Sequence, residues 1–200
     1  MDTRLNRIFR FVMLAISLSS SVVLAGPAED MERAKAYYSK QQLTDAAVIY
    51  KNLASQNYLP AQAMLGELLN YTEAPVEATG WFIMAAFQGD PAGAYGLARA
   101  YSEGSGIKKD PQQALYWFKF AADKDYLAAI IVLENAYRKG STLPVPVDLK
   151  QAEFWKTKRE PLEAAEKKAY EERLATVQKQ IDEKKAATKK ADEEAAKNSR

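Results

Sequence analysis

Apolar residues along the middle of the chain recur with the spacing of amphipathic α-helices. The clearest stretch has apolar residues at positions i, i+3, i+4 and i+7: Ala114, Trp117, Phe118 and Ala121. This spacing places the four side chains on one helix face. Tyr116 and Phe120 form a second apolar face on the same helix. A helix that is apolar on two sides is expected when it packs between its own partner and a neighbouring helix pair.

The helical pattern repeats along the chain with a nearly constant period. Three copies contain Ala-x-x-Trp, with tryptophans 36 and 38 residues apart: Trp81, Trp117 and Trp155. A weaker copy places Ile49 32 residues before the first of these. Each copy follows a second helical stretch, and three of these stretches share a leucine: Leu65, Leu97 and Leu133. The sequence therefore predicts an all-α fold, an α-solenoid of about four helix-turn-helix repeats, with the tryptophans and nearby alanines in its core.

Several helix starts are marked by proline. Asp90-Pro91 and Asp110-Pro111 each place a capping carboxylate before a proline at the first helical position. Pro60 and Pro161 are predicted to lie in first helical turns as well.

One loop between two helices contains two glycines and two lysines: Gly104, Gly106, Lys108 and Lys109. These residue types would suit either a phosphate-binding loop or a simple turn. A phosphate-binding loop requires G-x-x-x-x-G-K-[ST] after a strand. Here the spacing differs and a helix precedes, so a turn is predicted.

The repeated residues resemble those of the Sel-1-like repeat family, short-period relatives of the tetratricopeptide repeat. The family pattern is roughly A-x-x-x-L-G-x-x-Y-x-x-G-x-G-[VI] followed by D-x-x-x-A-x-x-W-[YF]-x-x-A-A. The best copy matches this pattern at Leu97, Tyr101, Gly104, Gly106, Ile107, Asp110, Ala114, Trp117, Phe118, Ala121 and Ala122. The copies from Ala61 and Ala129 are more degenerate, and the latter has Glu134 in place of a glycine.

The resemblance covers about residues 30–158 and implies an α-solenoid that binds other proteins. Exported bacterial members of the family tend to act as adaptors in envelope assembly, secretion or signalling. A minority of related exported proteins are linked to β-lactam binding or hydrolysis, but those are rich in cysteine pairs, and this chain has no cysteine. The expected partner is therefore a protein of the cell envelope.

The first 25 residues have the three-part pattern of a secretory signal peptide. Three arginines form a basic start: Arg4, Arg7 and Arg10. The run Phe11–Val23 is apolar apart from its serines, and Val23 and Ala25 suit the −3 and −1 positions of a cleavage site. Cleavage after Ala25 is predicted, giving a periplasmic or secreted protein with no stable membrane span. An uncleaved anchor is the alternative.

Residues 26–158 are assigned to the repeat solenoid and residues 159–200 to a charged tail rich in Ala, Lys and Glu. The tail is predicted to be a long helix with a short apolar seam in 4-3-4 spacing: Tyr170, Leu174, Val177 and Ile181. The seam spans barely two heptads. It fits either a solvated helix that ends the chain or an arm for partner binding or weak self-association.

The composition narrows the possible chemistry. The chain has neither cysteine nor histidine, which excludes Cys/His zinc sites and Ser-His-Asp or Cys-His nucleophiles. Residues 26–155 carry 12 basic and 15 acidic side chains, and residues 156–200 carry 13 and 10, so neither part is typical of a nucleic-acid binder. We therefore expect a non-enzymatic protein with no catalytic residue, metal or cofactor. The alternative is a carboxylate-dependent envelope enzyme acting on a glycan or a β-lactam, with Glu67 and Glu103 as nominal candidates.

Binding in a solenoid is expected at positions that vary between repeats and face the concave side. On the first helices of three repeats these positions are Glu67, Asn70, Arg99, Ser102, Asn135 and Arg138. Their change from acidic to basic along the stack would suit a peptide partner, although ordinary solvated helix faces would look the same. Tyr71 and Tyr95 are possible aromatic anchors that could equally be packed.

Overall fold

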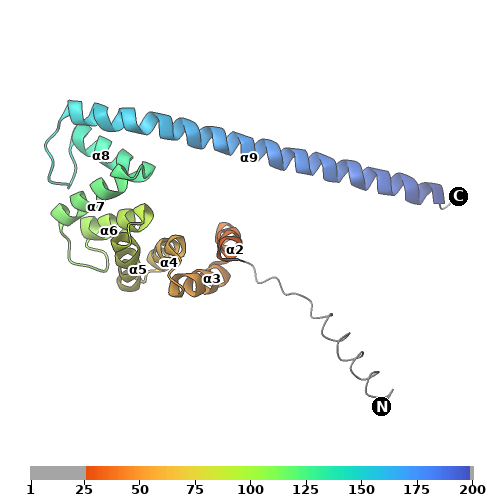
Figure 1. Ribbon diagram of the computed structural model, residues 1–200, viewed down its shortest axis with the longest axis horizontal. Helices are drawn as coiled ribbons and strands as arrows, with labels where there is room; N and C mark the ends of the chain where they lie inside the picture. The colour runs from red at the N-terminus through yellow and green to blue at the C-terminus, as the bar shows by residue number, and fades with distance from the viewer. Residues whose placement is uncertain (1–25, 199–200) are drawn as a thin grey trace, which may run out of the picture. The chain divides into compact units, whose positions relative to one another are not determined.

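The computed structural model describes residues 26–198, and side chains as far as residue 189; within these residues it contains eight helices and no strand (Figure 1). The predicted signal peptide, residues 1–25, lies outside the described part. The chain divides at Tyr58 into two units, which are described in turn.

The first unit contains one helix pair. α2 (Pro27–Ser39) and α3 (Leu43–Ser55) pack against each other across a short turn. Their buried contacts are formed by Met31, Ala34, Ala46, Tyr50, Leu53 and Ala54. This pair corresponds to the first predicted repeat.

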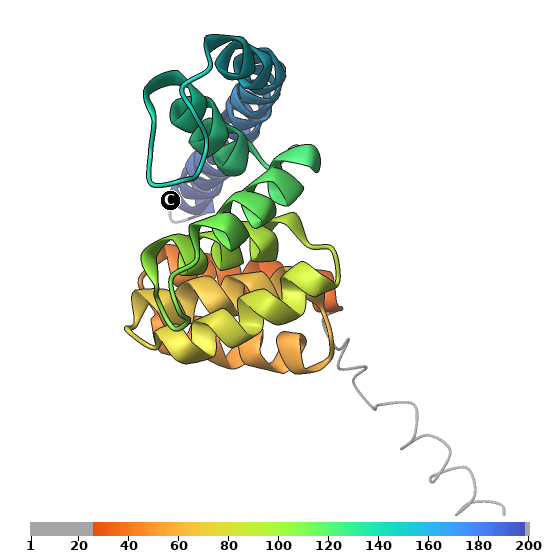
Figure 2. The ribbon, with the colours of Figure 1, turned by 90° about the vertical axis from the view of Figure 1, so that its left-hand side faces the viewer.

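The second unit contains three more helix pairs. They are α4 (Leu59–Tyr71) with α5 (Pro75–Phe87), α6 (Pro91–Glu103) with α7 (Pro111–Asp123), and α8 (Leu127–Lys139) with α9 (Leu149–Asn198). Each helix packs against the next one in the chain, and α4 also contacts α6 (Figures 1 and 2). The predicted succession of helix-turn-helix repeats is confirmed, as is the long charged helix that follows them.

Small residues allow neighbouring repeats to approach closely. The ring of Phe82 lies between Gly66 of α4 and Gly96 of α6; a Cβ atom on either glycine would come within 2.5 Å of the ring. Gly93 meets Ala85 in the same way, because its Cβ would lie 2.4 Å from that of Ala85. Side chains larger than hydrogen at these glycines would force the helices apart.

The predicted tryptophan core is correct for two of the three repeats. Trp117 and Trp155 are buried, with exposed fractions of 7% and 5%. Trp81 is only partly buried, so its assignment to the core is wrong. Tyr116 and Phe120 flank Trp117 with ring centroids 5.0 and 5.5 Å away, whereas the matching positions in α5 are Gly80 and Met84.

The glycine-containing loop is a turn that also connects two repeats. Gly104 ends α6 with a φ of +82°, and Asp110 caps α7 by accepting hydrogen bonds from the backbone N–H groups of Gln112 and Gln113. Gly106, with a φ of +70°, lies against the start of α5, and the hydroxyl of Thr79 donates to the carbonyl of Ser105 at 2.9 Å. The loop thus packs on the preceding repeat.

The predicted helix starts are correct except at Pro161. Asp90 caps α6, accepting from the N–H of Gly93 at 2.6 Å, and Pro60 is the second residue of α4. Pro161 instead lies inside α9, which begins at Leu149 behind the capping carboxylate of Asp148. The helix therefore runs without interruption through the predicted boundary between solenoid and tail.

Candidate functional site

The first helices of the second unit bring two of the predicted binding residues together. Glu67 of α4 and Arg99 of α6 form an ion pair, with 3.5 Å between Oε2 and Nη1, and both side chains are about one third exposed. Arg99 Nε lies 3.8 Å from Oε1 of Glu103. The guanidinium carbon also lies 5.9 Å from the centre of the Tyr95 ring, in cation–π range.

Aromatic rings extend this site from α6 to the start of α8. Tyr95 packs on Tyr126 and on Phe118, with ring centroids 5.2 and 5.7 Å away. Tyr126 is the residue that immediately precedes α8. We call Glu67, Tyr95, Arg99, Glu103 and Tyr126 the tyrosine–arginine cluster.

The cluster is short of positive charge. Burial raises the pKa of the Glu67 carboxyl, and Arg99 offsets this only in part. Burial also raises the pKa of the Tyr95 and Tyr126 hydroxyls; the negative charge of Glu67 adds to the effect at both, and Arg99 offsets part of it. Another cation beside Glu67 would therefore be favourable.

The other predicted residues do not all join this cluster. Asn70 and Ser102 lie on the same first helices and are partly exposed. Asn135 is exposed and donates from its side-chain amide to the carbonyl of Ile131. Arg138 binds Glu134, one turn back on its own helix, at 2.7 Å. Of the possible anchors, Tyr71 is 62% exposed and Tyr95 is packed in the cluster.

Arg138 belongs to a separate ionic network between α8 and α9. The buried carboxylate of Glu134 accepts from Arg138 and from Arg159 of α9, each at 2.7 Å. Arg159 also binds Glu163, so the network spans Pro161. Burial would raise the pKa of Glu134, but the two guanidinium groups more than offset this and lower it. Glu134 replaces a glycine of the repeat pattern, and its ion pair with Arg159 connects α8 to α9.

The arrangement of Glu67 and Glu103 does not resemble a catalytic carboxylate pair. Both side chains bind the same guanidinium, Arg99, whereas glycosidase carboxyls face each other across the scissile bond. Among the residues that the structure describes, no group of three or more acidic side chains is placed to hold a metal ion. Within that same part of the chain, no helix is long and apolar enough to span a membrane.

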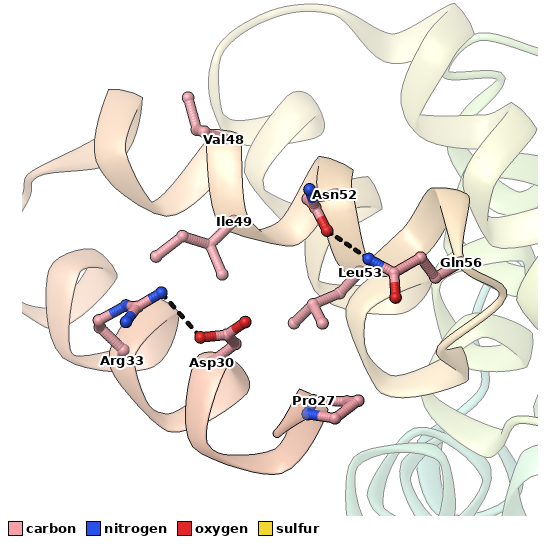
Figure 3. Close-up of a pocket in the computed structure, with 8 residues that line it drawn as sticks. All are labelled: Pro27, Asp30, Arg33, Val48, Ile49, Asn52, Leu53 and Gln56. Carbon is pink, nitrogen blue, oxygen red and sulfur yellow. Dashed lines mark hydrogen bonds and ion pairs between the residues drawn. The ribbon is translucent and has the colours of Figure 1, made fainter. Parts of the chain in front are cut away.

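A groove that the sequence did not indicate lies on the first helix pair (Figure 3). It has a volume of about 420 Å³ and is lined by Pro27, Asp30, Arg33, Val48, Ile49, Asn52, Leu53 and Gln56. Two polar pairs border it: Arg33 binds Asp30 at 2.7 Å, and the side-chain amide of Gln56 donates to that of Asn52 at 2.5 Å. Ile49 and Leu53 point into the groove between these pairs (Figure 3).

These features define an α-helical repeat protein in which tryptophan and small residues stack successive helix pairs. The family model of the Sel1 repeat matches residues 91–126, which comprise α6, the glycine loop and α7. The structure is similar to that of a Sel1 repeat protein from Oxalobacter formigenes, with a TM-score of 0.63 and 23% identity over 68% of this chain and 57% of that one. Residues 91–126 thus match a Sel1 repeat, and the fold of the chain is that of Sel1-like repeat (SLR) proteins, as the resemblance predicted.

Two further proteins are similar to this chain. A protective antigen of uropathogenic Escherichia coli strains that displays an SLR fold has a TM-score of 0.58 and 25% identity, covering 73% of this chain and 32% of that one. An uncharacterized protein of Neisseria meningitidis serogroup B is 31% identical over 122 residues, which are 61% of this chain and 25% of that protein. This chain therefore spans only about a quarter of the length of that relative.

Proposed function

We propose that the protein is an exported, non-enzymatic adaptor that binds a segment of a partner protein along the first helices of its repeats. Proteins with the SLR fold generally mediate protein–protein interactions, and the repeat match and fold support that general role here. The tyrosine–arginine cluster is the observation that favours the first helices as the binding surface. The cluster connects three consecutive repeats through the ion pair of Glu67 with Arg99 and the ring contact of Tyr95 with Tyr126. Its charged side chains are partly exposed, and packing of the repeats against each other does not require charged side chains there.

The chemistry of the cluster suits a partner segment with a basic side chain. Glu67 and Glu103 share a single guanidinium at 3.5 and 3.8 Å, which are long distances for charge-assisted hydrogen bonds. A lysine or arginine from the partner would supply the missing positive charge, and Tyr95 and Tyr126 would provide apolar surface beside it. We expect binding on the concave side at Glu67, Asn70, Arg99 and Ser102, and extension towards Asn135 and Arg138 for a longer segment.

Export to the periplasm or the cell exterior is proposed from the first 25 residues alone. Their basic start, apolar run and small residues before Gly26 support cleavage after Ala25. Mass spectrometry of the protein purified from the cell envelope should identify Gly26 as the first residue. A chain that retains Met1 would favour the uncleaved anchor.

The exposed part of α9 is proposed as an arm for a second contact or for weak self-association. Four apolar residues at one seam are 41–59% exposed there: Tyr170, Leu174, Val177 and Ile181. A seam of this length would bind weakly by itself.

Site-specific photo-crosslinking in living cells would test the adaptor role. A photoreactive residue at Ser102, beside the cluster, should yield one dominant protein adduct. The same residue at Lys119, which is exposed on the second helix α7, should not yield it. Glu67→Gln removes the carboxylate that the partner's basic side chain would meet, and should strongly reduce the Ser102 adduct without changing the melting temperature by more than a few degrees, since Arg99 keeps its contact with Glu103. Equal adducts from both positions, or an unchanged adduct in Glu67→Gln, would contradict the proposed surface.

A further inference from the structure

The groove on α2 and α3 corresponds to a face that is covered elsewhere in the stack. The first six repeat helices are each 13 residues long; α2, α4 and α6 begin at residues 27, 59 and 91, and α3, α5 and α7 at residues 43, 75 and 111. Ile49 in the groove therefore matches Trp117 of α7. Likewise, Asp30 and Arg33 match Ala94 and Leu97 of α6.

In the pair α6–α7 the end of the preceding helix lies over this face. Phe87, the last residue of α5, packs edge-on against Trp117 with ring centroids 5.3 Å apart. Ala94 and Leu97 have exposed fractions of 0% and 1%. The stacking interface therefore includes an aromatic side chain, 74% exposed, at the end of one helix and set against the next helix pair.

In the first pair the same face is open in the part of the chain that the structure describes. Val48 is 66% exposed, and Ile49 and Leu53 line a groove of about 420 Å³. That volume is in the range of small binding pockets, about 300–1,000 Å³. Asp30 and Arg33 take the positions of buried apolar residues of α6, so the border of the groove is polar. The floor remains apolar.

We propose that this groove binds an α-helix of a partner protein, which inserts one aromatic side chain against Ile49 and Leu53 as Phe87 does against Trp117. Continuity with the stacking interface supports this choice, because the partner helix would lie on α2 and α3 as the end of α5 lies on α6 and α7. An aromatic side chain buries a large apolar area for little loss of conformational freedom. This site is separate from the tyrosine–arginine cluster and does not depend on it.

The charge on α2 specifies the partner further. Glu29 and Glu32 occupy the positions at which α6 has Gly93 and Gly96, the glycines that allow α5 to come close. A partner helix must therefore lie farther from α2 than α5 does from α6 and closer to α3. Lysine or arginine on its α2 side would pair with Glu29, and with Glu32 in competition with Lys35, which binds Glu32 at 2.7 Å. The partner is thus a basic helix with a single aromatic anchor.

Methyl NMR of the full-length chain with designed peptides would test this proposal. The probe is a 17-residue alanine-based helix with one central phenylalanine and lysines one turn on either side. We expect it to shift the methyl resonances of Val48, Ile49 and Leu53 in a saturable manner. A matched peptide with alanine in place of phenylalanine should bind at least tenfold more weakly. A peptide with glutamate in place of lysine should bind with several-fold lower affinity.

Two protein variants distinguish peptide binding in the groove from nonspecific peptide binding. Val48→Lys places a like charge at the groove and should weaken the phenylalanine peptide at least tenfold. Val76→Lys, at a 71% exposed position of α5, should leave the affinity unchanged. Equal binding of the phenylalanine and alanine peptides, or an unchanged affinity in Val48→Lys, would overturn the proposal. Groove resonances that shift with protein concentration alone would also overturn it, because the occupant would then be a second copy of the chain.

Discussion

Gly106 lies directly against the carbonyl group of Pro75, so that a Cβ atom at Gly106 would be 2.0 Å from that oxygen. The two residues belong to successive repeats, since Pro75 begins α5 and Gly106 lies in the loop between α6 and α7. The oxygen is a backbone atom and cannot rotate away. The glycine therefore fulfils two requirements, a positive φ and a close approach of the loop to the preceding repeat.

Gly106→Ala should lower the free energy of unfolding by about 2–4 kcal/mol, the sum of the left-handed backbone cost and the steric overlap. Gly89→Ala is the matched control, because Gly89 also has a positive φ, of +90°, but open space around its Cβ position. It should cost only about 1–2 kcal/mol. Urea denaturation of the two variants measures the difference; equal losses would mean that contact with Pro75 adds nothing.

Trp117→Ala should cost about 3–5 kcal/mol, as for other large aromatic truncations in a core. Trp117 contacts Phe87, Tyr116 and Phe120, so its removal leaves a cavity between two repeats. Tyr116→Ala is the control at an exposed neighbour and should cost much less, since the Tyr116 side chain is 58% exposed. Thermal unfolding followed by circular dichroism would reveal the difference, and a near-native Trp117→Ala would contradict the packing described here.

The sequence predicted the helix pairs well because the signal for them is repeated. Each copy of the Trp and Ala pattern supports the others, and caps such as Asp90 and Asp110 depend only on residues within three positions. The pairing of Glu67 with Arg99 also follows from the repeat, since their positions match on helices that lie side by side. Local and periodic features were therefore predictable.

What the sequence did not indicate depends on residues that break the pattern. Pro161 suggested a helix start because proline favours first turns, but α9 had already begun twelve residues earlier, at Leu149. Glu134 and Arg159 are 25 residues apart and belong to no shared motif. The groove near Ile49 is lined by residues of both α2 and α3, and no repeated motif marks that combination.

Glu134→Gln should destabilise the protein at neutral pH and have little effect in acid. The carboxylate binds Arg138 and Arg159, and its pKa is lowered in the folded state. Its stabilising contribution is therefore present above the ordinary glutamate pKa of about 4.3 and is lost as the pH falls through the lower, folded-state value. Unfolding experiments from pH 3 to pH 7 should show the difference between variant and wild type growing with pH.

Glu153→Gln is the control for this pH dependence, because Glu153 forms an exposed pair with Lys156. Exposed pairs contribute little to stability, so this variant should follow the wild type across the whole pH range. A Glu134→Gln curve parallel to the wild type would show that the network with Arg159 does not stabilise the fold.

Pro161→Ala should stabilise α9 and raise the free energy of unfolding, by up to about 3 kcal/mol. Proline inside a helix has no N–H to donate to the carbonyl four residues earlier, here that of Thr157, and its ring crowds that carbonyl. Leu162 still packs against the core beyond this point, so the gain should reach the folded repeats.

Pro60→Ala is the control and should change stability by less than about 0.5 kcal/mol, because Pro60 lies in the first turn of α4, where no hydrogen bond is lost. Chemical denaturation and helix content by circular dichroism measure both variants. A Pro161→Ala variant no more stable than the wild type would show that α9 accommodates the proline without the expected cost.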